Sequence, residues 1–338
     1  MSDLADPTPA VSRAPAPYTF ADPRALLAGA EGARTPVSFL SEGVTVAGHL
    51  YRPPGAAGRR PAVVLLGPMT YVKEQVPAEY ARRLAARGYV ALAFDPRFRG
   101  ESEGTPRDLE SPLAKVADVR HAVAYLAARP DVEPGRIAAL AVCQGSSEML
   151  RAAADEPRIR ALATVAGHYR DHAGDVAWLG SEDALAARRA RGEAARAAYE
   201  QTGVAEYVPG VDRERGDVGM PGTYVWSWYQ RWADAGVWPN RYAVMSDAEL
   251  LAYESLSAAE RLHTPYLMLH SDNSFLPDAA RRHFARVPAR AKRLSWAGDT
   301  QHFQFYDDPA VIDGAVAEID AWFTAHLPTA TAPEPHAA

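Results

Sequence analysis

The sequence predicts an α/β protein with a doubly wound, mostly parallel sheet and an inserted helical cap region. Short continuous apolar runs, typical of strands covered on both faces, alternate with segments whose apolar residues recur at helical spacing. This alternation indicates βαβ units, in which consecutive strands run parallel. One long interval interrupts the alternation, and we interpret it as the cap.

The regular part of the chain begins with a predicted hairpin over residues 35–52, where apolar and polar residues roughly alternate. We expect the core at 18–167 and 263–327, with loose Pro/Ala-rich tails at 1–17 and 328–338. Further strands are predicted at 61–66, 89–94, 137–142, 159–166, 263–270 and 291–296, and helices at 79–87, 113–128, 147–154 and 310–326.

Residues 168–262 form the interval that breaks the alternation. An Ala/Arg/Glu-rich helical stretch is followed there by an aromatic-dense stretch over residues 224–232. Because Trp and Tyr both line pockets and fill cores, two interpretations stay open. The interval is either a cap whose aromatics line a substrate pocket, with Trp226, Trp228 and Tyr229 as pocket residues, or a small packed subdomain.

Composition and charge exclude several classes of function. The 338-residue chain has a formal net charge of −6, which does not favour binding to nucleic acid, since phosphate neutralisation needs a basic face. No apolar run reaches the roughly 18 residues of a membrane span, and the first residues do not read as a secretory leader. A single cysteine excludes an internal disulfide and fits a reducing cytoplasm, which is the location we expect.

A candidate nucleophile lies at a turn between a predicted strand and a predicted helix. The strand 137–142 is followed by Cys143, Gln144 and Gly145. This layout is that of a nucleophile elbow, usually G-x-S-x-G, with Ala141 in place of the first Gly and Cys143 in place of the Ser. The nearby helix N-terminus is expected to lower the thiol pKa. The alternative is an inert buried thiol.

The candidate base is His302, which lies between the last predicted strand and the closing helix. A base needs an acid to orient it, and we expect that acid after the penultimate strand. Asp272 is the nearest carboxylate there and is our first choice, with Asp278 and Asp299 as the alternatives. Asp272 has a simpler possible role as a cap of the turn or of the following helix.

An acyl-transfer site also needs N–H groups for the developing oxyanion. We expect them from the amide of Gln144, which follows the nucleophile, and from the loop after strand 61–66. Pro68 has no N–H, so Met69 offers the first amide in that loop. Tyr71, from the same loop, is a candidate pocket residue.

His168 and His172 form an i, i+4 pair that resembles a metal site on a helix. The Glu of the H-E-x-x-H pattern is missing, and no third ligand is spaced to match. We therefore predict neither a metal nor a cofactor. His168 follows the carboxyl end of a strand and is expected to face the substrate pocket beneath the cap.

The chain resembles the α/β-hydrolase superfamily, and within it the dienelactone-hydrolase-like group that includes bacterial YcjY-type proteins. The resemblance runs from about residue 35 to residue 327. The group's signatures are similar to four segments: Val-Lys-Glu-Gln at 72–75, Ala-Leu-Ala-Phe-Asp at 91–95 with Arg-Gly-Glu-Ser at 99–102, Val-Glu-Pro-Gly-Arg-Ile at 132–137, and the strand at 158–165. Members often carry Cys where other hydrolases carry Ser. The resemblance implies an α/β-hydrolase fold with Cys143 as nucleophile and His302 as base.

Two departures from the group concern the site itself. The group's His-Pro-Gly-Gly-Gly corresponds to Gly-Pro-Met-Thr-Tyr at 67–71, which replaces glycines by bulkier residues. Its Gly-x-Cys-x-Gly-Gly corresponds to residues 141–146, where Gln144 is expected to add a side-chain amide beside the reaction centre. The resemblance therefore specifies the scaffold better than the substrate.

The sequence thus predicts a hydrolase that acts on an activated acyl substrate, an ester, thioester or lactone, through a Cys-His-Asp triad and a covalent thioester. One alternative is a cyclase, lyase or acyl transferase of secondary metabolism that uses the same site without water. Another is a ligand-binding homologue without catalysis. The expected partner is a small-molecule acyl substrate, and a homodimer is suggested by analogy alone.

Overall fold

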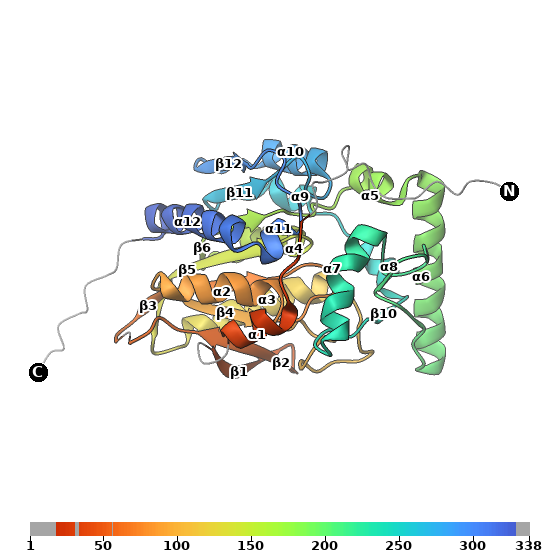
Figure 1. The fold of residues 1–338 in the computed structure, drawn as a ribbon, viewed down its shortest axis with the longest axis horizontal. Helices are drawn as coiled ribbons and strands as arrows, with labels where there is room; N and C mark the ends of the chain where they lie inside the picture. The colour runs from red at the N-terminus through yellow and green to blue at the C-terminus, as the bar shows by residue number, and fades with distance from the viewer. Residues whose placement is uncertain (1–17, 31–33, 56, 329–338) are drawn as a thin grey trace, which may run out of the picture.

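The computed structural model describes residues 18–30, 34–55 and 57–328. The predicted tail at 1–17 and all but the first residue of the predicted tail at 328–338 lie outside these ranges. An eight-stranded sheet forms the centre of the molecule, in the order β1-β2-β4-β3-β5-β6-β11-β12 (Figure 1). Its strands are β1 (Arg34–Ser41), β2 (Val44–Tyr51), β3 (Arg60–Leu66), β4 (Val90–Phe94), β5 (Val132–Val142), β6 (Ile159–Val165), β11 (Tyr266–His270) and β12 (Lys292–Trp296).

Only the first part of the sheet is antiparallel. β1 pairs with β2 and β2 pairs with β4 in antiparallel register, and the remaining neighbours are parallel. The predicted hairpin and the predicted parallel strands are therefore confirmed. The carboxyl ends of the parallel strands meet at one edge of the sheet, which is where ligands bind in such folds.

Helices cover both faces of the sheet. Along β3, Val63 and Leu65 pack into one core, whereas Ala62, Val64 and Leu66 pack into the other, which explains the continuous apolar run. The first core includes α2 (Val76–Ala86) and α12 (Pro309–His326), with α1 (Pro23–Ala30) beside α2; the second includes α3 (Pro112–Ala127), α4 (Gly145–Asp155), α9 (Leu256–Ala259) and α10 (Pro277–Arg286).

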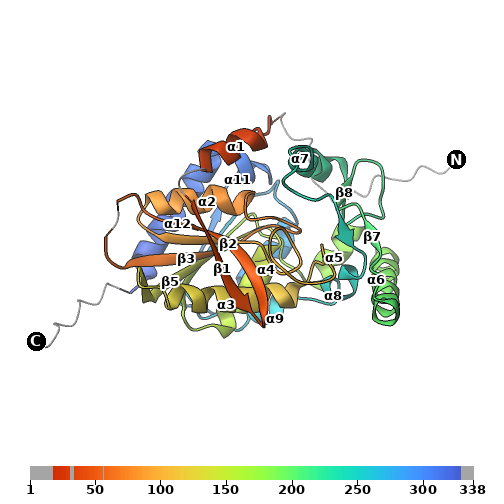
Figure 2. The same ribbon diagram turned by 90° about the horizontal axis from the view of Figure 1, so that it is seen from below.

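Most of the interval between β6 and β11 forms a mostly helical group beside the sheet, whereas its last helix, α9, belongs to the second core. Figure 1 shows α5 to α8 at one end of the sheet, and Figure 2 shows α6 and α7 apart from α2 and α12. The group contains α5 (His172–Leu179), α6 (Glu182–Thr202), α7 (Thr223–Asp234) and α8 (Ser246–Leu250), with the short strands β7 (Tyr207–Val208), β8 (Val211–Asp212), β9 (Met220–Pro221) and β10 (Tyr242–Ala243). Among the described helices, none combines the length and the apolar character needed to cross a bilayer.

Candidate active site

Cys143 lies on a strained turn between β5 and α4. Its φ of +54° is in the left-handed region, which a residue with a side chain rarely adopts. Its N–H donates to the Val165 carbonyl at 3.1 Å, and its carbonyl accepts the His168 N–H at 2.9 Å. A Cβ on Gly145 would lie 2.5 Å from the Gly67 carbonyl oxygen, so this position of the elbow requires glycine.

Three hydrogen-bond donors face the Cys143 thiol: the backbone N–H groups of Met69 and Gln144 and the hydroxyl of Tyr306. These donors favour the thiolate, but burial dominates and raises the thiol pKa to about 11. Part of the residue's surface stays open to a cavity, while surrounding protein still keeps water from the sulfur. The Gln144 amide at the start of α4 does lower the thiol pKa, as expected from the helix N-terminus, but burial outweighs this effect.

The loop that carries Met69, residues 67–75, is called the oxyanion loop below. Tyr229 donates its hydroxyl to the Met69 carbonyl at 3.0 Å, and Trp238 donates its indole N–H to the Thr70 carbonyl at 2.6 Å. The Thr70 N–H donates in turn to Glu110 at 3.1 Å. Side chains from the insertion thus hold the loop in the orientation that turns the Met69 N–H toward the thiol.

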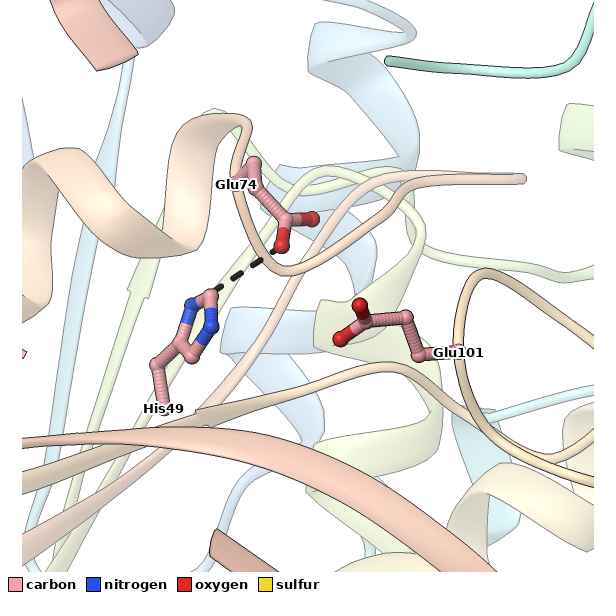
Figure 3. A group of neighbouring side chains, drawn as sticks. All are labelled: His49, Glu74 and Glu101. Carbon is pink, nitrogen blue, oxygen red and sulfur yellow. Dashed lines mark ion pairs between the residues drawn. The ribbon is translucent and has the colours of Figure 1, made fainter. Parts of the chain in front are cut away.

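A charged clamp around Lys73 fixes the other end of the oxyanion loop. The Lys73 N–H and ammonium donate to Asp95 at 2.7 and 2.9 Å, and the ammonium also contacts Glu74 at 2.8 Å and Glu101 at 2.7 Å. Figure 3 shows His49, Glu74 and Glu101 pointing toward one another, with ligand atoms within 4.8 Å. We interpret this group as structural and not as a metal site, because the Lys73 ammonium already lies among the carboxylates and would repel a cation.

The shifted pKa values of Lys73 and His49 indicate that the Lys73 ammonium is charged and that the His49 imidazole is neutral. Burial opposes the charge on Lys73, but Asp95 and Glu74 outweigh it and raise the Lys73 pKa. Burial, followed by the Lys73 charge, lowers the pKa of His49 to about 4. Residues 72–75, which resemble the Val-Lys-Glu-Gln signature, therefore attach the oxyanion loop to the end of β4.

Two hydrogen bonds connect His302 to the thiol, with the Tyr306 hydroxyl between them. Its Nε2 is 2.9 Å from the Tyr306 hydroxyl, and its Nδ1 accepts the Phe275 N–H at 3.3 Å. Burial, followed by the neighbouring His270, lowers the imidazole pKa to about 3. The ring is thus neutral and sits between the aromatic rings of Phe275 and Phe303.

The structure does not bring Asp272 to His302, so the predicted triad acid is wrong here. Trp296 and Arg281 draw the Asp272 carboxylate to the surface, with contacts of 2.9 and 3.0 Å, and its side chain is 58% exposed. Asp278 is 86% exposed and pairs with Arg281. In the described ranges no carboxylate hydrogen-bonds the His302 ring, and Asp299 contributes only a carbonyl contact to Asn273.

An apolar cavity of about 80 Å³ opens beside Cys143 and His302. Of the predicted pocket residues, His168 and Tyr229 line it. The remaining lining comes from the oxyanion loop, the insertion and the loops after β11 and β12: Met69, Trp178, Met220, Pro221, Gly222, Tyr224, Val225, Asn273, Ser274, Phe275, Phe303 and Tyr306.

Three predicted pocket residues do not line this cavity. Tyr71 is buried against Gly67, Trp226 lies under the Arg213 guanidinium, and Trp228 donates its indole N–H to Asp307. The helical spacing of α7 explains the outcome for the two tryptophans, since only one face of the helix turns to the cavity. Both interpretations of the insertion therefore hold in part: some aromatics line the cavity, and others fill a core.

The side chain of Gln144 is held away from the reaction centre, contrary to the sequence-based expectation. Its amide N–H donates to Glu148 at 2.9 Å, and its oxygen accepts from Arg170 at 2.9 Å. Arg170 also pairs with Asp175 at 2.6 Å. Burial is the main reason that the Glu148 pKa is raised, to about 7. Gln144 therefore offers the site its backbone amide, fixed by this polar network.

Sequence reasoning missed Tyr306. A signal was available, because Tyr306 follows His302 by four residues, the spacing that puts two side chains on one side of a helical turn. His168 was identified, and its environment is informative: it lines the cavity, and its Nε2 has no hydrogen-bond partner in the part of the chain that is described. Burial holds its pKa well below the usual value, so it is a neutral polar group.

The sheet order, the elbow after β5 and the histidine after β12 define the α/β-hydrolase fold. The solved structure of the hypothetical protein PA2218 from Pseudomonas aeruginosa superposes with a TM-score of 0.77 at 24% identity, over 87% of this chain and 94% of that chain. Residues 46–176 match the dienelactone hydrolase family. The predicted fold and group are thereby confirmed.

Three curated relatives match between 37% and 38% of the chain. PA2218 is 41% identical over 130 residues, which is 38% of this chain and 35% of the relative. YcjY of Escherichia coli is 36% identical over 134 residues, 38% of this chain and 44% of the relative. A thiohydrolase of Eupenicillium brefeldianum is 33% identical over 124 residues, 37% and 39% of the two chains. The chain thus spans less than half the length of each of these relatives.

Proposed function

We propose that this protein is an acyl hydrolase in which Cys143 forms a covalent thioester with an activated acyl substrate. The observation that carries the proposal is the position of the thiol. It projects from an elbow turn toward two backbone N–H groups, at Met69 and Gln144, and opens onto an apolar cavity. A thiol between oxyanion donors and a hydrophobic pocket is suited to attack on a carbonyl carbon.

In the proposed reaction, Cys143 Sγ attacks the acyl carbon, and the carbonyl oxygen becomes an oxyanion held by the Met69 and Gln144 amides. The leaving group departs as the carbonyl re-forms, which leaves the acyl group on sulfur. Water then attacks this thioester, and the acid product is released as the thiol re-forms. His302 is the proposed base for both halves, since its ring is neutral and therefore able to accept a proton.

The proposed substrates carry a hydrophobic acyl group on a good leaving group. Aromatic and aliphatic side chains dominate the cavity, among them Trp178, Tyr224 and Phe275. A thiol with a raised pKa and an imidazole without a carboxylate partner suit a thioester or aryl ester better than an amide, whose leaving group needs stronger acid catalysis. The similarity to a thiohydrolase supports the thioester in particular.

A second candidate is acyl transfer to an acceptor other than water, as in a cyclase or acyl transferase. The small apolar cavity favours it, because such a lining leaves little room and few partners for an attacking water. Turnover in ¹⁸O-labelled water separates the two reactions. Hydrolysis places one labelled oxygen in the product acid, whereas transfer to another acceptor gives an unlabelled product.

The experiment that tests the proposal is a comparison of the wild type with Cys143→Ala on p-nitrophenyl esters and acyl thioesters of increasing chain length. We expect the variant to lose about 10⁴-fold or more in kcat/KM, as enzymes do without their nucleophile. Thermal unfolding of both proteins checks that the fold survives. Full activity of folded Cys143→Ala on every substrate would refute covalent catalysis at this residue.

A further inference from the structure

The hydroxyl of Tyr306 lies between the thiol and the imidazole. Its oxygen is 2.9 Å from His302 Nε2, and the same hydroxyl is a hydrogen-bond partner of the Cys143 thiol. Within the described residues no direct hydrogen bond joins Cys143 to His302. We propose that Tyr306 is a catalytic residue, through whose hydroxyl the proton passes between Cys143 and His302. This inference rests on the proposed function and assigns a further residue to the same site.

Tyr306 is held firmly in this position. Its ring is 1% exposed and packs against Trp228 and Phe303, each with ring centres 5.0 Å away. The short helix α11 (Gln304–Asp307) carries it, and Tyr80 anchors that helix by donating to the Phe305 carbonyl at 2.8 Å. Although Tyr306 also lines the cavity, its ring is wedged between these aromatic neighbours, so the hydroxyl remains the link between the imidazole and the sulfur.

The proposed step moves two protons together, and it starts once the Tyr306 hydroxyl has turned its proton from the Cys143 sulfur to His302 Nε2 so that the thiol donates to the Tyr306 oxygen. The Cys143 S–H bond breaks as its proton bonds to the Tyr306 oxygen, and the Tyr306 hydroxyl proton moves to His302 Nε2. The products are a thiolate, a neutral tyrosine and an imidazolium. Tyr306 never becomes a phenolate, which agrees with burial raising its pKa well above the ordinary value. The reverse movement returns a proton to the sulfur when the acyl group leaves it.

The neighbours of the ring define what this relay requires. For Nε2 to accept, the neutral imidazole must hold its own proton on Nδ1. In a Ser-His-Asp triad a carboxylate fixes that tautomer. Here Nδ1 accepts the Phe275 N–H at 3.3 Å, longer than the usual 2.7–3.2 Å, so the relay requires the ring to give up this weak hydrogen bond and to turn its Nδ1–H away from the Phe275 N–H when it changes tautomer. Because no carboxylate among the described residues bonds to the ring and would stabilise the imidazolium, the transfer should occur together with sulfur attack and not before it.

The test measures thiol reactivity, which does not depend on knowing the substrate. The chain has one cysteine, so mass spectrometry of iodoacetamide labelling reports Cys143 alone. Tyr306→Phe keeps the ring and removes the hydroxyl. We expect it to slow labelling at pH 7.5 by about 10²-fold, with a similar loss in His302→Ala and no further loss in the double variant, since both act on one proton path. Tyr266→Phe is the matched control, because it removes a buried hydroxyl, bonded to Thr164 at 2.8 Å, that is outside the cavity lining.

Wild-type labelling rates in Tyr306→Phe would overturn the relay, and so would losses that multiply in the double variant. If Tyr306→Phe does not fold, the wild type gives the answer in mixtures of light and heavy water. The labelling rate is plotted against the deuterium fraction of the solvent and corrected for the isotope effect of the thiol itself. A two-proton transfer gives a curved plot, and a straight line contradicts the relay. Failure of the proposed function is a separate result, since it is read from turnover by Cys143→Ala.

Discussion

The two loops beside Cys143 are held in different ways. The oxyanion loop is fixed by the Lys73 clamp at one end and by hydrogen bonds from Tyr229 and Trp238 at the other. The loop of His302 is fixed by backbone contacts and aromatic packing, and its imidazole has no described carboxylate partner. The proposed oxyanion donors are therefore preorganised more strictly than the proposed base, an arrangement that would suit the activated substrates proposed above.

Removing the clamp should have the largest effect. Lys73→Met leaves the buried Asp95 and the largely buried Glu74 without their cation, so we expect a loss of about 3–5 kcal/mol of stability, because uncompensated buried charge is costly. Activity should fall as well, since the Met69 amide loses its support. Urea unfolding and ester hydrolysis measure the two effects. Lys292→Met is the control, because that lysine contacts two backbone carbonyls and the Phe284 ring and no described carboxylate; equal losses in both variants would contradict the clamp.

Glu148 accepts a hydrogen bond from the Gln144 side chain, and it should make the stability of the protein depend on pH. Its folded pKa of about 7 lies above the ordinary 4.5, so protonation favours the folded state. The stability from this group is fully present below about pH 4.5 and is lost as the pH rises through 7. Glu148→Gln does not titrate and still accepts from Gln144. Its stability relative to the wild type should therefore rise between pH 4.5 and pH 8 by up to about 3 kcal/mol in urea unfolding. A constant difference would contradict the assignment.

Tyr229→Phe loosens the oxyanion loop without disturbing its charges. The variant removes the hydroxyl that donates to the Met69 carbonyl at 3.0 Å and leaves that buried carbonyl without this partner. We expect kcat to fall by about 10-fold, with a loss of about 1 kcal/mol of stability. Steady-state kinetics with a short-chain ester, together with Tyr266→Phe as control, measures the effect. An unchanged kcat would mean that this hydrogen bond does not position the Met69 amide.

Asp272→Asn should have the smallest effect, because this exposed carboxylate is bound to Trp296 and Arg281 and does not touch His302. We expect kcat/KM to change by less than about 3-fold, in contrast to the roughly 10⁴-fold loss that follows removal of the orienting acid from a triad. The same ester assay measures it. A loss of 10²-fold or more would show that Asp272 reaches the histidine loop during turnover.

The sequence predicted the scaffold well because its signals are local. Buried strands read as apolar runs, and the elbow reads as a nucleophile between a strand and small residues, so Cys143 and His302 could be found by position. Met69 could be chosen because Pro68 has no N–H. Each of these inferences depends on a short segment and on the order of the elements along the chain.

The predictions of the triad acid and of the pocket lining failed because both depend on contacts between distant segments. Asp272 follows the strand after which the acid was expected, but Arg281 and Trp296 bind its carboxylate instead. No pattern in the sequence indicates those contacts. The aromatic residues of α7 divide between a core and the cavity according to the packing of one helix face, as Trp228 and Tyr229 show. Tyr306 was the missed residue that a helical-spacing argument could have supplied.

The central claim is that the acyl group passes through the Cys143 sulfur. The most direct measurement is rapid-quench mass spectrometry of the protein during turnover of an acyl thioester, followed by peptide mapping. We predict a mass increase of one acyl group on the peptide that contains Cys143, formed more slowly in Tyr306→Phe and never in Cys143→Ala. Turnover without any acylated Cys143 peptide, at times shorter than one catalytic cycle, would contradict the account.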